Sequence, residues 1–394
     1  MTISDSNMDA RASGTDYATK STMRAKPPRT LNEIDFWRGY ALIAIFINHV
    51  PGIFFERFTH REIGISDSAE LFVFLAGFSL RYLAESRTEE LRGARLFMRL
   101  EGRAFTLYAA QILIASAALA MMAGAALWLD TPLILQWNNA ASFFENPVAT
   151  QIGIVALVHQ MGYFDILPLY IVLMIVAPLV VIVYRWSPPL LFLVSATIWA
   201  VTLAGGYNLP TWPVEGVWFF NPLAWQFVFV LGFILARPAE PLARILAHRG
   251  KLRVLGGLIV LAGYVMALRG WTPSPFDVPE PRLFFMNDKT YLTPMRLIHL
   301  LGLVLLMRGA FEAVRGCEAV RGWRGFERLA APLCTLGRNS LHVFCAGSLL
   351  SLAGQLLRFA APISVFTDVV VVMVGVPILL IVAWGNEWRT NLRR

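Results

Sequence analysis

The sequence predicts an all-α integral membrane protein built as a bundle of about ten transmembrane helices. Composition is the first reason: 57% of the 394 residues are hydrophobic and only 15% are charged, and the mean hydropathy is +0.58. The second reason is a succession of ten apolar runs, of about the length that crosses a hydrocarbon core of about 30 Å. Together these properties exclude an ordinary soluble domain.

The ten runs follow one another between residues 34 and 385. Two of them, 189–205 and 221–237, are near the lower length limit and would need tilt or local thinning of the bilayer. A further apolar stretch, 151–161, is too short to cross and predicts an interfacial or re-entrant helix. The runs cover 34–55, 67–86, 104–128, 163–184, 189–205, 221–237, 253–268, 291–310, 335–357 and 363–385.

Residues 1–30 form a separate polar segment. It has no apolar core, so it does not predict a cleavable signal peptide. Its many Ser, Thr and basic residues are typical of a disordered tail. We therefore expect a disordered cytoplasmic tail over 1–30 and a transmembrane domain over 31–394.

Basic residues are unevenly distributed among the loops. If the N-terminus is cytoplasmic, the loops richest in Lys and Arg share that side, as the positive-inside rule requires. The segments 129–162 and 206–220 on the other side contain neither residue. Both termini are therefore expected in the cytoplasm. This distribution also accounts for the formal net charge of +8 without a nucleic-acid partner. The three cysteines have neither a disulfide framework nor a metal-binding spacing.

The first apolar run contains an acid, a base and a histidine. At 100° per residue, Asp35, Arg38 and His49 fall within an arc of about 60°, and Arg38 and His49 lie about 16 Å apart along the axis. Ionisable groups in a membrane usually face a cavity and mark function. Asn48 points away from this stripe unless the helix unwinds near Pro51. The alternative is that Arg38 extends to the headgroups and His49 is an ordinary core histidine.

These residues and several later segments resemble a known family. The Arg-x10-His spacing and the segment 66–78 resemble the membrane-bound acyltransferase-3 superfamily, and more closely its OpgC branch, which succinylates osmoregulated periplasmic glucans. The resemblance implies a bacterial inner-membrane O-acyltransferase with an acyltransferase-3-like fold. It implies succinyl-CoA as the cytoplasmic donor, a periplasmic glucan as the acceptor, and no tightly bound cofactor. The matching segments are 38–49, 66–78, 163–170, 287–291 and 336–344, so the resemblance spans residue 29 to the C-terminus.

A carboxylate layer is expected beside His49. Counted from the outer helix ends, His49 lies about 9 Å deep and Glu70 about 5 Å deep, with Asp67 one turn nearer the surface. A carboxylate beside an imidazole fixes its tautomer and raises its basicity, which suits a base that activates a hydroxyl. With Asp35 from the first run, these residues form the expected catalytic set. The alternatives are that Asp67 only caps its helix and that Glu70 pairs with Arg61.

A second polar layer is expected at the start of the run 291–310. Arg296 and His299 share a face at i, i+3 spacing and lie about 7–12 Å deep. A fixed cation there could hold a substrate carboxylate or stabilise the oxyanion of acyl transfer. Asp165 is the expected ion-pair partner if Arg296 instead holds helices together. Lys289 is expected at the outer mouth. With Asn48, these are the candidate acceptor-side and acyl-binding residues.

The donor is expected at the cytoplasmic end. Arg38 faces inward, and Arg338 and His342 share a face at the start of the ninth run. Three such cations would suit the phosphates of coenzyme A. The alternative is that they are the basic residues normally found at cytoplasmic helix ends.

Two further alternatives stay open. A transporter of a glycan or an organic acid could also use buried charges along its path. An acetyl group could replace the succinyl group, because the extra carboxylate needs only one added cation. Whether His49 acts as base or as nucleophile is likewise open.

Overall fold

The computed structural model describes most of the chain beyond its first thirty residues. The described residues are 31–62, 64–85, 93–240, 242–271, 273–274, 276–316 and 324–392. The tail expected over 1–30 lies outside them. The described residues form helices joined by loops and contain no strand, so the all-α class is confirmed.

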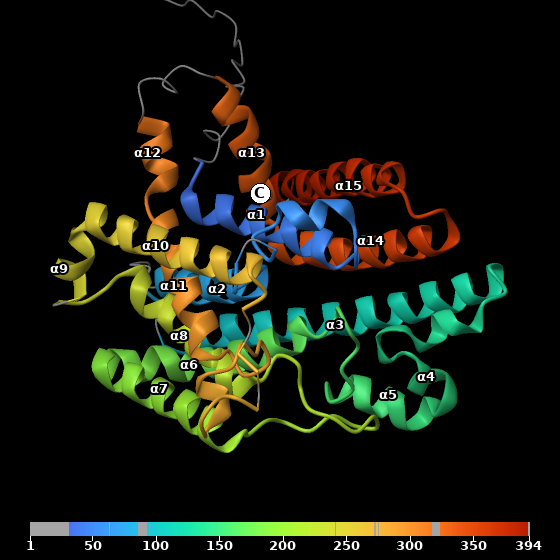
Figure 1. Cartoon of the computed structure of the whole chain (residues 1–394), viewed down its shortest axis with the longest axis horizontal. Coiled ribbons are helices and arrows are strands. Elements are labelled where there is room, and N and C mark those ends of the chain that lie inside the picture. The colour runs from blue at the N-terminus through green and yellow to red at the C-terminus, as the bar shows by residue number, and fades with distance from the viewer. Residues whose placement is uncertain are drawn as a thin grey trace, which may run out of the picture. The chain divides into compact units, whose positions relative to one another are not determined.

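Each of the ten apolar runs overlaps a helix, and the helix ends differ from those of the runs by up to ten residues (Figure 1). Six helices are long and apolar enough to cross a membrane, which makes the protein a multi-pass membrane protein. These six are α3 (Ala94–Trp128), α6 (Ile166–Trp186), α7 (Pro188–Gly205), α10 (Arg249–Leu268), α14 (Ser340–Ala360) and α15 (Val365–Leu392). The other four are α1 (Glu33–Asn48), α2 (Ser68–Ala84), α8 (Pro222–Ala236) and α11 (Pro294–Met307).

Shorter elements connect the main helices. Among the described residues these are α4 (Ala141–Glu145), α5 (Pro147–Val155), α9 (Leu242–Ala247), α12 (Ala310–Gly316) and α13 (Arg324–Arg338), with 3-10 turns η1 (Phe54–Phe58), η3 (Pro132–Asn139) and η4 (Arg282–Phe284).

Two predicted boundaries are wrong for local reasons. The run 335–357 is divided at Asn339, whose side chain donates to the carbonyl of Thr335 at 2.8 Å and ends α13. The short helix expected over 151–161 is α5, which ends at Val155. Its extension stops because Leu157 has a φ of +62°, in the left-handed region where helices end.

The packing of α2 on α8 depends on two glycines. A Cβ at Gly77 would overlap the carbonyl oxygen of Phe229, and a Cβ at Gly232 would overlap that of Phe74. Small residues at such crossings let two backbones approach closely, as is common between membrane helices. On the other side α1 packs against α2, α13 and α14, and α14 packs against α15 (Figure 1). This packing fixes the relative positions of the C-terminal end of α1 and the N-terminal end of α2.

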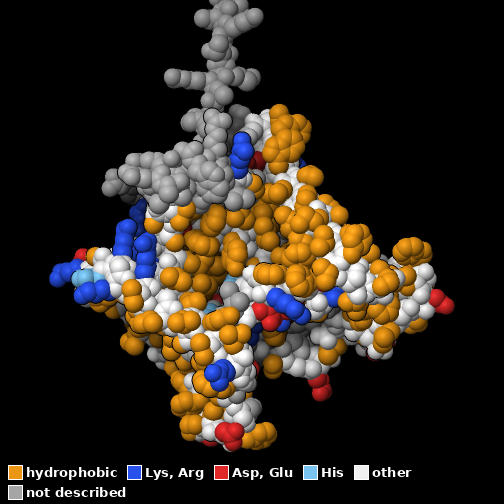
Figure 2. Space-filling model, turned by 45° about the horizontal axis from the view of Figure 1, so that its top comes forward, with side chains coloured by type: hydrophobic (Ala, Val, Ile, Leu, Met, Phe, Trp, Pro, Cys, Tyr) orange, Lys and Arg blue, Asp and Glu red, His pale blue; other side chains and the backbone are white. Residues whose placement is uncertain are grey.

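The exposed surface is rich in hydrophobic side chains, unlike the surface of a soluble protein. Figure 2 shows hydrophobic side chains spread over much of the visible face. Leu127 is 85% exposed and Trp186 is 79% exposed, both on helices long enough to cross the bilayer. Large exposed apolar areas of this kind mark a lipid-facing surface. Polar residues gather instead in the interior, around the site described next.

Candidate functional site

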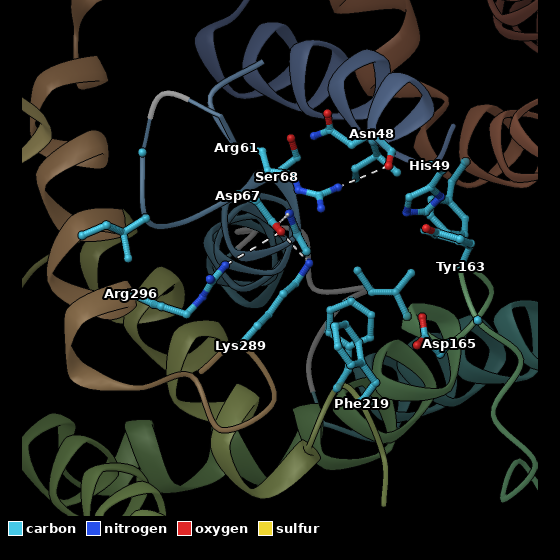
Figure 3. A pocket seen from close by; sticks show the side chains of 18 of the residues that line it. Asn48, His49, Arg61, Asp67, Ser68, Tyr163, Asp165, Phe219, Lys289 and Arg296 are labelled. Carbon is cyan, nitrogen blue, oxygen red and sulfur yellow. Dashed lines mark hydrogen bonds and ion pairs between the residues drawn. The ribbon is translucent and has the colours of Figure 1, made fainter. Parts of the chain in front are cut away.

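A cavity of about 570 Å³ opens where α1 ends, and we call it the His49 cavity (Figure 3). α1 stops at Asn48, and the turn that follows contains Pro51, which lacks a backbone N–H, and Gly52, whose φ is +70°. The end of the helix therefore lets Asn48 line the same cavity as His49. The cavity brings together six residues singled out in the sequence: Asn48, His49, Asp67, Asp165, Lys289 and Arg296.

His49 lies on the wall of this cavity, directly after the last helical residue. Its ring faces Tyr163, with the two ring centroids 5.0 Å apart. Its Nδ1 atom is buried and has no hydrogen-bond partner in the described part of the chain. Its backbone carbonyl accepts a hydrogen bond from Gln355 Nε2 at 2.6 Å. The backbone of His49 is thus fixed by α14, while its ring forms part of the cavity wall.

Glu70 pairs with Arg296 and not with the imidazole of His49. Arg296 places Nε at 2.6 Å and Nη2 at 2.5 Å from Glu70 Oε1, and the Glu70 side chain is fully buried. The expected pair of Glu70 and His49 is therefore not formed, nor is the alternative pair with Arg61. The reason is the rotation of α11, which points Arg296 toward the first turn of α2.

Asp67 caps α2, as the alternative for this residue predicted, and its catalytic role stays a prediction. It caps α2 by accepting from the backbone N–H of Ala69 at 2.8 Å, and its own N–H donates to Glu70 Oε2 at 3.0 Å. Its second carboxylate oxygen lies 2.5 Å from Lys289 Nζ and 3.8 Å from Arg296 Nη2. Two acids and two bases thus form one compensated network on this wall of the cavity, which we call the charge network (Asp67, Glu70, Lys289 and Arg296).

Asp165 and Arg61 stand outside the charge network. Asp165 is buried across the cavity from Arg296 (Figure 3), so its expected role as the partner of Arg296 is not realised. Arg61 lines the cavity with a side chain that is 46% exposed. It lies 3.2 Å from Glu56 and donates a long bond of 3.4 Å to the carbonyl of Asn48. Sequence reasoning treated Arg61 only as a partner, although it lies in the loop between His49 and Asp67.

The turn after α1 is held by a buried ion pair between α14 and α15. Arg358 donates from Nη1 to the carbonyl of Pro51 at 2.7 Å and from Nη2 to the carbonyl of Gly52 at 2.9 Å. Its Nε lies 3.1 Å from Asp368 Oδ1, and Asp368 Oδ2 accepts from the N–H of Phe54 at 2.7 Å. The planar guanidinium thus uses all three nitrogens on the turn and its partner.

His299 lies behind the wall of the cavity and does not line it. Its Nδ1 accepts a hydrogen bond from the N–H of Ser66 at 3.2 Å and lies 2.7 Å from Ser66 Oγ. Its ring is packed between Gly64 and Gly263, where a Cβ would come within 2.5 Å or less of ring atoms. This environment supports the wall, and a direct role of His299 in binding stays a prediction.

A second cavity, of about 460 Å³, surrounds Arg38, and we call it the Arg38 cavity. Arg38 Nη2 donates to the carbonyl of Leu75 at 2.9 Å and to Ser79 Oγ. Two further arginines line it, Arg99 and Arg103, from one face of α3 at i, i+4 spacing. Within the described ranges, none of the three arginines has a carboxylate ion-pair partner. Sequence reasoning counted Arg99 and Arg103 only among the basic residues of a loop.

The remaining expected residues lie away from both cavities. Arg338 Nε pairs with Glu387 at 2.7 Å on α15, and His342 is exposed on the first turn of α14. The Asp35 carboxylate accepts from Asn32 Nδ2 at 2.6 Å at the start of α1. The functional roles assigned to these three residues stay predictions. Over the described residues, no group of three or more His, Cys, Asp and Glu side chains is arranged to hold a metal.

The described residues thus form an all-helical, multi-pass membrane protein with ionisable groups around interior cavities, a pattern that marks functional sites in membranes. A comparison with protein families narrows this class. Residues 29–391 match the family described as OpgC protein. The match covers nearly the whole chain, so the protein belongs to the OpgC family, as its motifs predicted. The family indicates a membrane glucan-modifying acyltransferase. A search of curated proteins found no match.

Proposed function

We propose that the protein transfers an acyl group, succinyl by preference, from cytoplasmic acyl-CoA to hydroxyl groups of a periplasmic glucan. The observation that carries the proposal is the pair of polar cavities along α1, one around Arg38 and one around His49. The donor's charged nucleotide cannot enter hydrocarbon without a large desolvation penalty. Two cavities along one helix would let the donor and the acceptor approach from opposite sides. This orientation places both termini in the cytoplasm of a bacterial cell and the His49 cavity toward the periplasm.

The Arg38 cavity suits the donor's phosphates. Arg38, Arg99 and Arg103 line it, and Ser79 and Thr106 add hydroxyl groups. Charge-assisted hydrogen bonds from guanidinium groups to phosphate are among the strongest available to a protein. Uncompensated cations around a cavity favour an anionic ligand over a neutral one. We therefore assign the donor's phosphates to this cavity, with α3 contributing in place of Arg338.

The His49 cavity suits the transfer step. An imidazole nitrogen of His49 takes the proton of a glucan hydroxyl, and the oxygen attacks the thioester carbonyl. The carbonyl oxygen becomes an oxyanion that a nearby cation stabilises. Its collapse expels the coenzyme A thiolate, which accepts the proton from the imidazolium. The product is an ester on the glucan, and no covalent intermediate on the protein is required.

Among the cations of the His49 cavity, Arg61 is the best suited to an acyl carboxylate. Arg296 already makes two short contacts with Glu70, and Lys289 is paired with Asp67 at 2.5 Å. Arg61 is more exposed and has one acidic partner, Glu56. A charge-assisted bond to a ligand carboxylate would contribute about 1.5–3 kcal/mol, a preference of roughly ten- to hundredfold over an uncharged acyl group.

The test is a transfer assay on the purified full-length protein in lipid nanodiscs. Release of free coenzyme A from succinyl-CoA and esterification of the glucan are measured together. His49→Gln keeps the side chain polar but cannot accept a proton, so both readouts should fall to background. His248→Gln, at an exposed position before α10, is the matched control and should retain activity. A wild-type protein that releases no coenzyme A in nanodiscs, but carries glycan across the membrane of proteoliposomes, would refute the proposal in favour of the transporter.

A further inference from the structure

The two cavities are separated by only one layer of side chains. α1, α2, α6 and α14 line both of them. On three of these helices, the change from the His49 cavity to the Arg38 cavity falls within about one turn: Ala69 to Phe72, Ile166 to Tyr170, and Phe344 to Ser340. Three or four residues of α-helix correspond to a rise of about 5–6 Å. The polar space on the two sides is therefore interrupted only over the thickness of an aromatic ring and its neighbours.

The separating layer consists of aromatic rings, which we call the aromatic partition (Phe72, Tyr170 and Phe344). Phe72 lines the Arg38 cavity and stacks on Phe344, which lines the His49 cavity, with centroids 6.4 Å apart and planes at 20°. The ring of Tyr170 lies 5.4 Å from that of Phe72. All three side chains are buried. The Tyr170 hydroxyl has no hydrogen-bond partner among the residues described, so no polar contact anchors this ring.

The partition stands between the groups that must react. Phosphates held by Arg38, Arg99 and Arg103 remain on one side, while His49 lies about 16 Å farther along α1. The part of an acyl-CoA that joins phosphates to thioester is a slender, flexible chain without ionised groups. Such a chain can pass between apolar rings, whereas the nucleotide cannot, because its charges would lose their hydration.

We propose that Phe72 and Phe344 form a closed passage that the donor's flexible arm opens to bring its thioester to His49. This inference rests on the proposed function and adds the residues that control the route. With no donor present, the closed rings block water and protons between the two cavities. With the donor bound, the arm fills the same space, so the two sides never connect freely.

Size-graded variants at Phe72 separate this role from ordinary core packing. Phe72→Trp adds volume to a filled layer and narrows the passage for the arm, so transfer should slow by about tenfold or more. Binding of free coenzyme A at the Arg38 cavity should not change. Phe72→Leu and Phe344→Leu remove ring area and should open a leak. The matched control is Phe74→Leu, on the same helix but lining a separate apolar cavity.

Both properties are measured on the full-length protein in proteoliposomes. A pH-sensitive dye inside the vesicles reports proton leak, and the ratio of coenzyme A released to glucan esterified reports uncoupled hydrolysis. Phe72→Leu and Phe344→Leu should raise both quantities several-fold above Phe74→Leu. Equal leak in all three Leu variants, or wild-type transfer rates in Phe72→Trp, would overturn the inference. A wild-type protein without transfer activity refutes the proposed function instead, and the leak comparison is still interpretable in that case.

Discussion

Replacing Arg296 should damage the fold before it alters donor choice. Glu70 is fully buried, and Arg296 supplies its two closest contacts, at 2.6 and 2.5 Å. Arg296→Gln removes the only guanidinium that reaches this carboxylate among the described residues. Removing one partner of a buried ion pair typically costs about 3–5 kcal/mol, because the other charge is left unpaired. At about 2 °C per kcal/mol, the apparent Tm should fall by about 6 °C or more.

The assay compares thermal unfolding and transfer for three variants in the same detergent. Arg296→Gln should lower Tm and should reduce activity with succinyl-CoA and acetyl-CoA by similar factors. Glu70→Gln combined with Arg296→Gln removes both charges and should recover most of the lost stability. Glu70→Gln alone leaves Arg296 with Asp67 at 3.8 Å and should be less destabilised than Arg296→Gln.

One result would refute this reasoning. If Arg296→Gln keeps the wild-type Tm and loses activity only with succinyl-CoA, Arg296 binds the acyl carboxylate directly. That outcome would confirm the role expected for Arg296 from the sequence, in place of Arg61. Loss of rate with both donors at unchanged Tm would instead assign Arg296 to the oxyanion.

Three further predictions address the donor, the acyl group and the turn after α1. Arg61→Gln should lower kcat/KM for succinyl-CoA about tenfold or more while leaving kcat/KM for acetyl-CoA unchanged. The control Arg57→Gln, outside the cavity, should change neither value. Equal losses with both donors would exclude Arg61 as the residue that selects the acyl group. Arg103→Gln should raise the KM of the donor far more than the KM of the glucan, and Arg95→Gln, at an exposed position, is the control. If only the KM of the glucan changes, the donor binds elsewhere. Arg358→Lys keeps a positive charge but lacks the guanidinium group that binds two carbonyls of the turn after α1. We therefore expect kcat to fall while the KM of the donor is unchanged. An unaltered kcat would show that the turn does not need these hydrogen bonds.

The lengths of the apolar runs predict where the helices lie, and depths counted from the helix ends predict which side chains lie near the cavity. Counting from helix ends places His49 and Arg296 near one depth, Asp67 one turn nearer the surface and Lys289 at the outer mouth, and all four line one cavity. The helix cap considered as the alternative for Asp67 is also present at the start of α2, where its side chain accepts from the N–H of Ala69. These inferences depend only on distances along a helix, which the sequence contains.

The choice of partners could not be predicted in the same way. Whether Glu70 meets His49, Arg61 or Arg296 depends on how α2 and α11 are rotated about their axes. That rotation is fixed by packing between helices distant in sequence, such as α2 on α8. Arg99 and Arg103 were missed for a related reason, since basic residues at helix ends are expected in any membrane protein. Only the packing of α3 against neighbouring helices shows that they border a cavity.

The four main helices too short to count as spans share one property. α1 ends at the His49 cavity, α2 begins there, and the residues just before α8 line it, as does Arg296 in the first turn of α11. A backbone can leave helical geometry at membrane depth only where it is buried in protein or lines a wet cavity. The shortness of these helices therefore goes with the cavity, because each has one end beside it, where polar side chains such as Asp67 on α2 and Asn221 on α8 satisfy terminal N–H groups. Replacing these polar side chains by apolar ones would leave N–H groups at the starts of α2 and α8 without their caps, so polarity beside the cavity serves the fold as well as the proposed chemistry.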